Sequence, residues 1–201
     1  MCLRPQILAI LVLLTAALPA GAQVDVASAL ADRVMGNTNA PVEIIEYASL
    51  TCPHCADFHG GTLKELKTRY IDPGKVRLIY RDFPLDQGAL WASMLARCSS
   101  PSQYFGFIDV LFRSQGSWAK SRDPRQALMG VGRLGGMSSD QITACFENEE
   151  LLDGIVKMRQ EGAQNFNIQT TPTLIINGKN YSGNASIDNL AEVIDPLIPT
   201  N

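Results

Sequence analysis

The residues of this 201-residue chain best suited to chemistry are the two cysteines of the run Cys52-Pro53-His54-Cys55. The run follows an apolar segment, 42–50, and precedes a helix-like segment, 56–70. Two thiols with this spacing at the start of a helix lie on the same helix face, within reach of a disulfide bond. Such a pair can form a disulfide and exchange it with another thiol. We therefore expect redox chemistry at these two sulfur atoms.

The local sequence indicates which sulfur is the nucleophile. Pro53 suits the first position of a helix, where its missing N–H is not needed. Cys52 is then the N-cap, next to unpaired backbone N–H groups and the positive end of the helix dipole, which lower a thiol pKa. His54 can add a hydrogen bond or a positive charge. Stabilising the Cys52 thiolate stabilises the dithiol form, so the disulfide form is predicted to be a strong oxidant.

Other interpretations of these residues remain open. Cys52 and Cys55 can form a permanent structural disulfide, although this spacing at a helix start is strained. A zinc or copper site could use both cysteines with His54 or His59, but structural zinc normally has four ligands and the chain has only two histidines. We expect no metal and no other cofactor. His59 is interpreted as a histidine of the helix surface or of the packing.

The first 22 residues are predicted to be a signal peptide rather than part of the fold. Arg4 gives a short positive region, residues 7–18 are apolar, and Ala20-Gly21-Ala22 is typical of a cleavage site. The apolar run is short for a membrane-spanning helix, and an uncleaved anchor is the alternative. Residues 23–201 are then expected to form one exported domain.

Cysteine number and charge limit the remaining possibilities. Once Cys2 leaves with the signal peptide, four cysteines remain, which suits two disulfides in an oxidising compartment. We expect Cys98 to pair with Cys145, the alternative being two buried free thiols. Without Arg4 there are 16 basic and 20 acidic residues, a net charge of −4. This balance gives no indication of binding to nucleic acid or to anionic membranes.

The pattern of apolar residues predicts an α/β fold in two separated halves. An edge strand, 33–35, and a central strand, 42–50, precede the active-site helix, and the strand 75–83 completes a parallel βαβ unit. A return strand, 171–176, a hairpin turn at Asn177-Gly178 and a last helix, 187–197, form the second half. Between the halves the periodicity predicts helices alone, at 86–97, 102–113, 124–133, 139–146 and 149–165. Ser138 with Gln141 resembles a capping box for the fourth of them.

Cys52-Pro53-His54-Cys55 and Thr171-Pro172, in this order, resemble the motifs of the DsbA family of thiol:disulfide oxidoreductases, within the thioredoxin-like superfamily. The resemblance covers the chain from about residue 33 onward and is loose between the two halves. It implies a DsbA-like domain over 23–201. That domain would have a thioredoxin-like fold, with a frame of residues 32–84 and 167–201 and an inserted all-helical subdomain over 85–166.

The resemblance also implies roles for residues around the cysteines. Pro172 is expected to be cis and to lie against Cys52, leaving the backbone of Thr171 free to pair with an extended client peptide. A trans proline that merely begins a strand is the alternative. Glu46 is expected beneath the site, where it could relay a proton to Cys55. Alternatively, this carboxylate lies at a strand edge or pairs with an arginine.

The expected function is oxidation of client proteins in the periplasm. A reduced client would receive the Cys52–Cys55 disulfide through a mixed disulfide at Cys52, and a DsbB-like membrane partner, implied by the resemblance, would restore it. We expect a monomer. A disulfide isomerase or reductase with the same site is the alternative, and Thr171 before the proline also occurs in isomerase-type relatives. A metallochaperone or a passive peptide-binding module on the same fold is a third possibility.

Overall fold

The computed structural model describes residues 24–199, so the signal peptide predicted for 1–22 lies outside the described residues. Its five-stranded sheet has the order β1-β3-β2-β4-β5, with β2 in the middle. β2 and β3 are parallel, and the other neighbouring pairs are antiparallel. The strands are β1 (Arg33–Met35), β2 (Val42–Ala48), β3 (Val76–Asp82), β4 (Thr173–Ile176) and β5 (Lys179–Tyr181). The predicted central strand, edge strand and parallel unit are confirmed.

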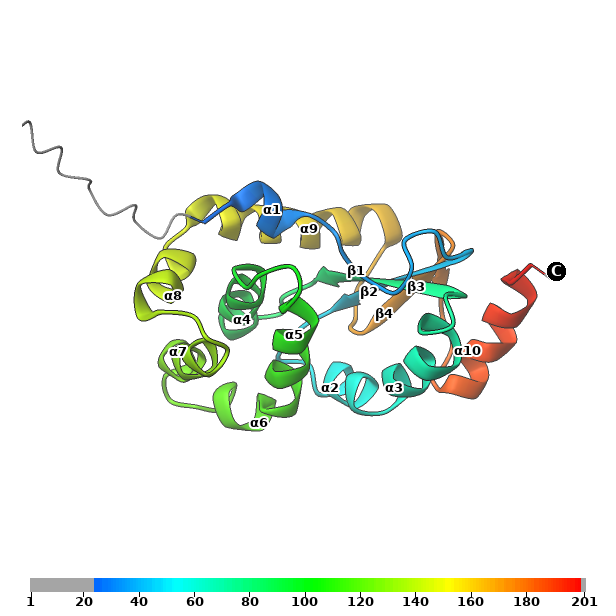
Figure 1. Ribbon diagram of the computed structural model, residues 1–201, viewed down its shortest axis with the longest axis horizontal. Coiled ribbons are helices and arrows are strands. Elements are labelled where there is room, and N and C mark those ends of the chain that lie inside the picture. The colour runs from blue at the N-terminus through cyan, green and yellow to red at the C-terminus, as the bar shows by residue number, and fades with distance from the viewer. Residues whose placement is uncertain (1–23, 200–201) are drawn as a thin grey trace, which may run out of the picture.

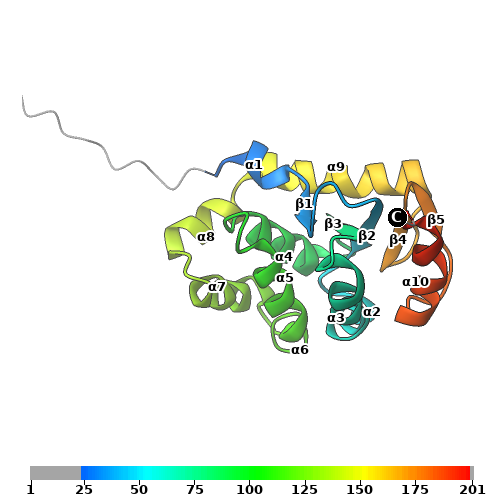
Figure 2. The same cartoon turned by 45° about the vertical axis from the view of Figure 1, so that its right-hand side comes forward.

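Helices cover both faces of the sheet (Figures 1 and 2). On one face lie α2 (Pro53–Gly60), α3 (Thr62–Leu66) and α10 (Ile187–Ile194). On the other runs the long helix α9 (Glu149–Phe166), with α1 (Val26–Leu30) beside it. β2 contributes to both layers because its side chains alternate: Ile44 packs under α3 and α10, whereas Tyr47 packs against Phe83 and Phe166.

The close approach of α9 to the sheet depends on a glycine. A Cβ atom at Gly162 would lie 2.5 Å from the ring of Tyr47, which is closer than atoms can pack. The missing side chain therefore lets α9 lie directly on β2.

The segment between β3 and β4 is helical, as predicted, which confirms an α/β fold with a helical insertion. Besides α9 it contains α4 (Gln87–Arg97), α5 (Tyr104–Arg113), α6 (Gln115–Trp118), α7 (Pro124–Leu134) and α8 (Ser139–Phe146). The predicted capping box of α8 is present, since Ser138 and Gln141 exchange side-chain and backbone hydrogen bonds. The sequence did not predict α6, because it has only four residues and no side-chain cap.

Two predicted helices differ from those observed. The helix expected over 56–70 is interrupted at Gly60-Gly61, where Gly61 leaves the helical region (φ −121°, ψ −88°), and it continues as α3 and a π-helical turn, Lys67–Ile71. Glycine lowers helix stability, and two in succession allow this break. The last helix ends at Ile194 and gives way to a 3₁₀ turn over Asp195–Leu197.

The structure contains the expected disulfide between Cys98 and Cys145. It joins the end of α4 to α8 and closes a sequence separation of 47 residues. On the chain-entropy model, closing a loop of this size stabilises the folded state by ~4 kcal/mol.

We expect the double variant Cys98→Ser/Cys145→Ser to lose up to about 4 kcal/mol of unfolding free energy. Urea titration of the variant and the parent chain measures this loss. The same variants should leave the pKa of Cys52 unchanged, and equal urea midpoints would contradict a stabilising role.

Candidate active site

Cys52 and Cys55 lie where β2 ends and α2 begins. Cys52 is the N-cap of α2, with extended backbone angles (φ −77°, ψ 120°), and Pro53 is the first helical residue, as predicted. Both cysteines are free thiols, so the structure describes the dithiol form. Cys52 is 7% exposed and Cys55 is fully buried. Of the two sulfur atoms, therefore, only Cys52 is open to an incoming thiol.

The surroundings of Cys52 favour its thiolate. Its pKa is lowered from 9.0 to about 5, mainly by a hydrogen bond from the side chain of Cys55. The hydroxyl of Thr171 and the backbone N–H groups of Cys55 and His54 act in the same direction, while burial opposes them. The N–H groups belong to the unpaired first turn of α2, so the N-cap position has the predicted effect.

Cys55 has the opposite tendency. Burial raises its pKa well above 9.0, and the hydrogen bond to Cys52 and the negative charge of Glu46 raise it further. At neutral pH the pair therefore consists of a thiolate at Cys52 and a thiol at Cys55, joined by a hydrogen bond. Chemically, Cys52 can act as nucleophile and leaving group, whereas Cys55 must lose a proton before it can attack.

His54 acts on this pair through its backbone. Its contribution to the low pKa of Cys52 comes from the main-chain N–H, and its side chain is exposed to solvent. The role predicted for its imidazole, a hydrogen bond or a positive charge that stabilises the Cys52 thiolate, remains a prediction.

Thr171 and Pro172 lie directly against Cys52, although they are about 120 residues away in sequence. The Thr171-Pro172 peptide bond is cis, as expected. Cys52 Sγ lies 3.2 Å from the carbonyl oxygen of Thr171, to which it donates a hydrogen bond when it is protonated. The backbone N–H of Thr171 has no hydrogen-bond partner within residues 24–199. Beside the nucleophile, the chain thus offers main-chain groups that an extended peptide can use.

Glu46 lies beneath the site, fully buried in β2. Its two carboxylate oxygens each lie 3.0 Å from Nε2 of His59, which donates to them in the tautomer with the hydrogen on Nε2. The alternatives of a strand edge or an arginine partner are wrong. His59 is not on the helix surface: it is buried, and its ring lies 4.3 Å from that of Phe112. The sequence left this pair unrecognised because its members are on different elements.

We expect His59→Phe to lower the free energy of unfolding by about 1–3 kcal/mol, because the buried carboxylate of Glu46 loses its hydrogen-bond donor. Urea unfolding measures the loss. His59→Gln, which keeps an N–H donor, is the matched control and should lose less. Equal stability of His59→Phe and the parent chain would show that the pair contributes nothing.

The loop before Cys52 is held by residues that sequence reasoning missed. From α6, Gln115 Nε2 donates to the carbonyl oxygens of Leu50 (2.8 Å) and Cys52 (3.0 Å). Asp86 accepts from the Thr51 hydroxyl at 2.6 Å and also caps α4. The N-cap role of Asp86 was readable from the sequence, but nothing in the sequence indicated Gln115.

A second buried ionic group lies one strand away. Arg97, at the end of α4, donates to Asp82 at the end of β3, and the side chains of both are fully buried. Arg97 also donates to the carbonyl oxygens of Ala29 (2.8 Å) and Ala31 (3.2 Å). Burial lowers the pKa of Arg97, but the charge and the hydrogen bond of Asp82, together with neighbouring tyrosines, raise it overall. The pair fastens the helical insertion and the N-terminal segment to the sheet.

Within residues 24–199 no three His, Cys, Asp or Glu side chains lie close enough together to hold a metal ion. In the same range, no helix has both the length and the apolar character needed to cross a membrane.

Comparison with known proteins places this geometry in a family. A family model described as thioredoxin matches residues 28–196. The crystal structure of Wolbachia pipientis alpha-DsbA1 is similar with a TM-score of 0.76 and 32% sequence identity, over 83% of this chain and 90% of that one. The chain belongs to the DsbA family. BdbD from Bacillus subtilis shares the fold, with a TM-score of 0.71 at 22% identity, over 88% of this chain and 96% of that one.

Curated relatives of this DsbA-family chain carry consistent names. A putative protein-disulfide oxidoreductase of Rickettsia felis is 32% identical over 168 residues, which is 83% of this chain and 60% of that protein. Disulfide bond formation protein D of Bacillus subtilis is 25% identical, over 81% of this chain and 75% of that protein. The chain thus spans about three fifths of the length of the Rickettsia relatives that it matches.

Proposed function

We propose that this DsbA-family chain is an exported thiol:disulfide oxidoreductase that donates the Cys52–Cys55 disulfide to folding client proteins. The observation that carries the proposal is the low pKa of Cys52, about 5, beside a cysteine whose pKa is raised. A stabilised thiolate makes the dithiol form favourable, so the disulfide form is the one that gives its bond away.

The proposed reaction has two exchanges. A client thiolate attacks Sγ of Cys52, the Cys52–Cys55 bond breaks, and Cys55 leaves and takes up a proton because its pKa is raised. A second client thiolate then attacks the client sulfur of the mixed disulfide and releases Cys52 as a thiolate. The client is oxidised by two electrons and the Cys52–Cys55 pair is reduced by two. One client proton ends on Cys55 and the other goes to solvent.

Neighbouring groups have supporting roles in this proposal. The Thr171 backbone would hold the client as an added strand next to Cys52. Glu46, within the electrostatic reach of Cys55 and hydrogen-bonded to His59, would carry the proton to and from the buried thiol. The oxidised state would be restored by a DsbB-like membrane partner. The periplasm is the proposed compartment and the monomer the proposed state.

Equilibration of the Cys52–Cys55 pair with a glutathione buffer tests the proposal. We expect the pair to be reduced in buffers that leave an ordinary structural disulfide intact. A pair that resists reduction would contradict the role of donor. Refolding of scrambled ribonuclease separates the proposed oxidase from an isomerase, because an oxidase accelerates disulfide formation in reduced ribonuclease far more than the rearrangement of scrambled bonds.

The reduced form should also gain stability as the pH rises. The folded-state pKa of Cys52 is about 5, below its ordinary value of 9.0, so its contribution is complete above 9 and is lost as the pH falls through 5. We expect urea midpoints of the reduced protein, compared with the oxidised protein, to increase between pH 5 and 9. Above this window Cys55, whose pKa is raised, acts in the opposite direction. A difference independent of pH would mean that Cys52 titrates like a free thiol.

A further inference from the structure

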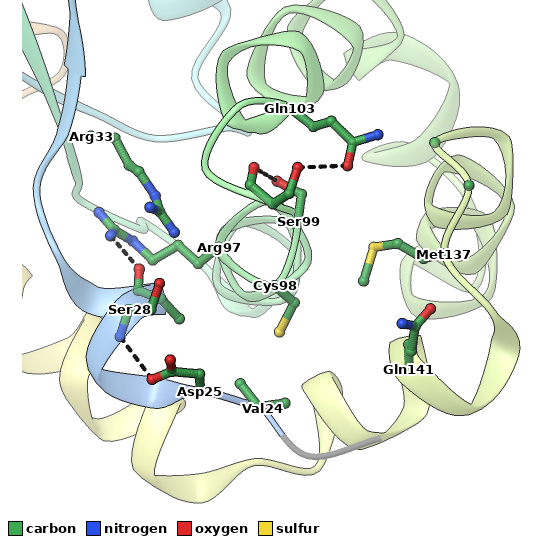
Figure 3. Close-up of a pocket in the computed structure, with 14 residues that line it drawn as sticks. Val24, Asp25, Ser28, Arg33, Arg97, Cys98, Ser99, Gln103, Met137 and Gln141 are labelled. Atoms are coloured by element: carbon green, nitrogen blue, oxygen red, sulfur yellow. Dashed lines mark hydrogen bonds between the residues drawn. The ribbon is translucent and has the colours of Figure 1, made fainter. Parts of the chain in front are cut away.

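A pocket of about 370 Å³ lies between α1 and the helical insertion, and neither Cys52 nor Cys55 lines it (Figure 3). α1, the end of α4, the start of α5 and the turn before α8 enclose it. Arg33 and Arg97 lie side by side at one side of the pocket, and Met137 and Gln141 are opposite them. Neither the cysteine chemistry nor the proposed client site uses this pocket.

Arg33 is the unusual member of the lining. It is only 7% exposed, yet it forms no ion pair with any residue of 24–199. Its Nε is buried and has no hydrogen-bond partner among residues 24–199. Within the described residues its terminal guanidinium nitrogens also form no hydrogen bond or ion pair, and the side chain lines the pocket. A buried charge without a partner is costly, and a bound group of opposite charge would remove that cost.

The nearby charges do not neutralise Arg33. Burial and, after it, the charge of Arg97 lower the pKa of Arg33, and the Cζ atoms of Arg33 and Arg97 lie 5.3 and 5.7 Å from the ring centroid of Tyr104. Asp82 lies behind the pocket and is paired with Arg97. Asp25 lines the pocket but is exposed, and its carboxylate accepts from the backbone N–H of Ser28 at 3.0 Å. Two positive groups therefore share one buried carboxylate.

Two other side chains of the lining offer donors, Gln141 across the pocket from Arg33 and Ser28 beside Arg97 (Figure 3). Gln141 accepts the backbone N–H of Ser138 with its oxygen, at 2.8 Å, which leaves its amide N–H₂ group for another partner. The hydroxyl of Ser28 makes no hydrogen bond within the described chain, so it is also available. A guanidinium fork with an amide and a hydroxyl donor suits an anionic group with several oxygen atoms.

We propose that this pocket binds an oxyanion, a carboxylate or a phosphate, with Arg33 as its counter-charge. The guanidinium of Arg33 forms the ion pair, the hydroxyl of Ser28 donates to a remaining oxygen, and the amide of Gln141 faces the anion from across the pocket. The site goes beyond the proposed disulfide chemistry and does not depend on it.

Titration of the oxidised, otherwise unaltered protein with inorganic phosphate and, separately, with succinate at constant ionic strength tests the proposal. Amide chemical shifts should change at Ser28, Ser99 and Gly136, and the melting temperature should rise with the concentration of the bound anion. Binding of phosphate alone would assign a phosphate ligand, and binding of succinate would assign a carboxylate. Binding of neither, or shifts confined to another surface, would overturn the proposal.

Variants link the binding to the residues. Arg33→Met should weaken binding of the anion at least about tenfold, since it removes the positive charge and keeps the apolar stem. Gln141→Glu keeps the capping box of α8 but replaces an amide donor with a carboxylate, so it should also abolish anion binding. This variant tests the site even if Arg33→Met fails to fold. Arg122→Gln, at an exposed arginine outside the pocket, is the matched control and should bind like the parent chain. Undiminished binding by a folded Arg33→Met or Gln141→Glu would refute the site.

Discussion

Cys55→Ala is expected to hold a client on Cys52 as a stable mixed disulfide. When Cys52 attacks the disulfide of an oxidised model client, one client sulfur bonds to Cys52 and the other leaves as a thiol. In the parent chain Cys55 then attacks Sγ of Cys52 and releases the client. Without Cys55 no internal thiol can do this, so the lifetime of the adduct should increase at least about tenfold. Non-reducing electrophoresis and mass spectrometry of the adduct measure this lifetime.

Two controls sharpen this experiment. Cys52→Ala should give no adduct, because the remaining thiol is fully buried and its pKa is raised. Cys55→Ser should trap the client as well, but its hydroxyl still donates to the Cys52 thiolate. The pKa of Cys52 should therefore rise more in Cys55→Ala than in Cys55→Ser, since the hydrogen bond from Cys55 is the main cause of the low value. An adduct on the alanine variant that is released as fast as in the parent chain would disprove a resolving role.

Arg97→Met is expected to have the largest effect on stability among single changes outside the cysteines. It leaves Asp82 as an unpaired charge in the core, which costs about 3–5 kcal/mol for buried pairs of this kind. It also removes the hydrogen bonds to the carbonyl oxygens of Ala29 and Ala31. A loss of this size is a large part of the stability of a typical domain. Urea unfolding of the oxidised protein measures it.

The matched control breaks an ion pair at the surface. Arg113 pairs with Asp109 one helical turn earlier, and both side chains are largely exposed. Arg113→Met should cost about 0.5 kcal/mol or less. The double variant Arg97→Met/Asp82→Leu should recover much of the loss, because it removes the unpaired carboxylate as well. Similar losses for Arg97→Met and Arg113→Met would show that the buried pair is not a structural anchor.

The sequence predicted those parts of the fold and site that depend on neighbours along the chain. Pro53 after Cys52 indicated the helix start, Ser138 with Gln141 indicated the capping box, and Asn177-Gly178 indicated the hairpin. In the structure both turn residues have positive φ, 45° and 78°, as such a turn requires. Each of these signals spans a few residues, so no tertiary information was needed.

The parts that the sequence did not predict depend on contacts between distant elements. His59 was interpreted from α2 alone, as a surface or packing histidine, because its partner Glu46 comes from a different element, the strand β2. Arg97 and Asp82 meet only because α4 packs against the end of β3. Helical periodicity places an arginine on a face of a helix, but it does not tell which carboxylate that face will meet.

Gln115 connects the helical insertion to the active-site turn of the thioredoxin-like frame. Its single amide group holds two main-chain oxygens of the active-site turn, and it comes from α6 in the helical insertion. The nucleophile is thus mechanically linked to a surface element remote from it in the chain. A protein that docks on α6 and displaces this amide would alter the reactivity of the sulfur without touching it.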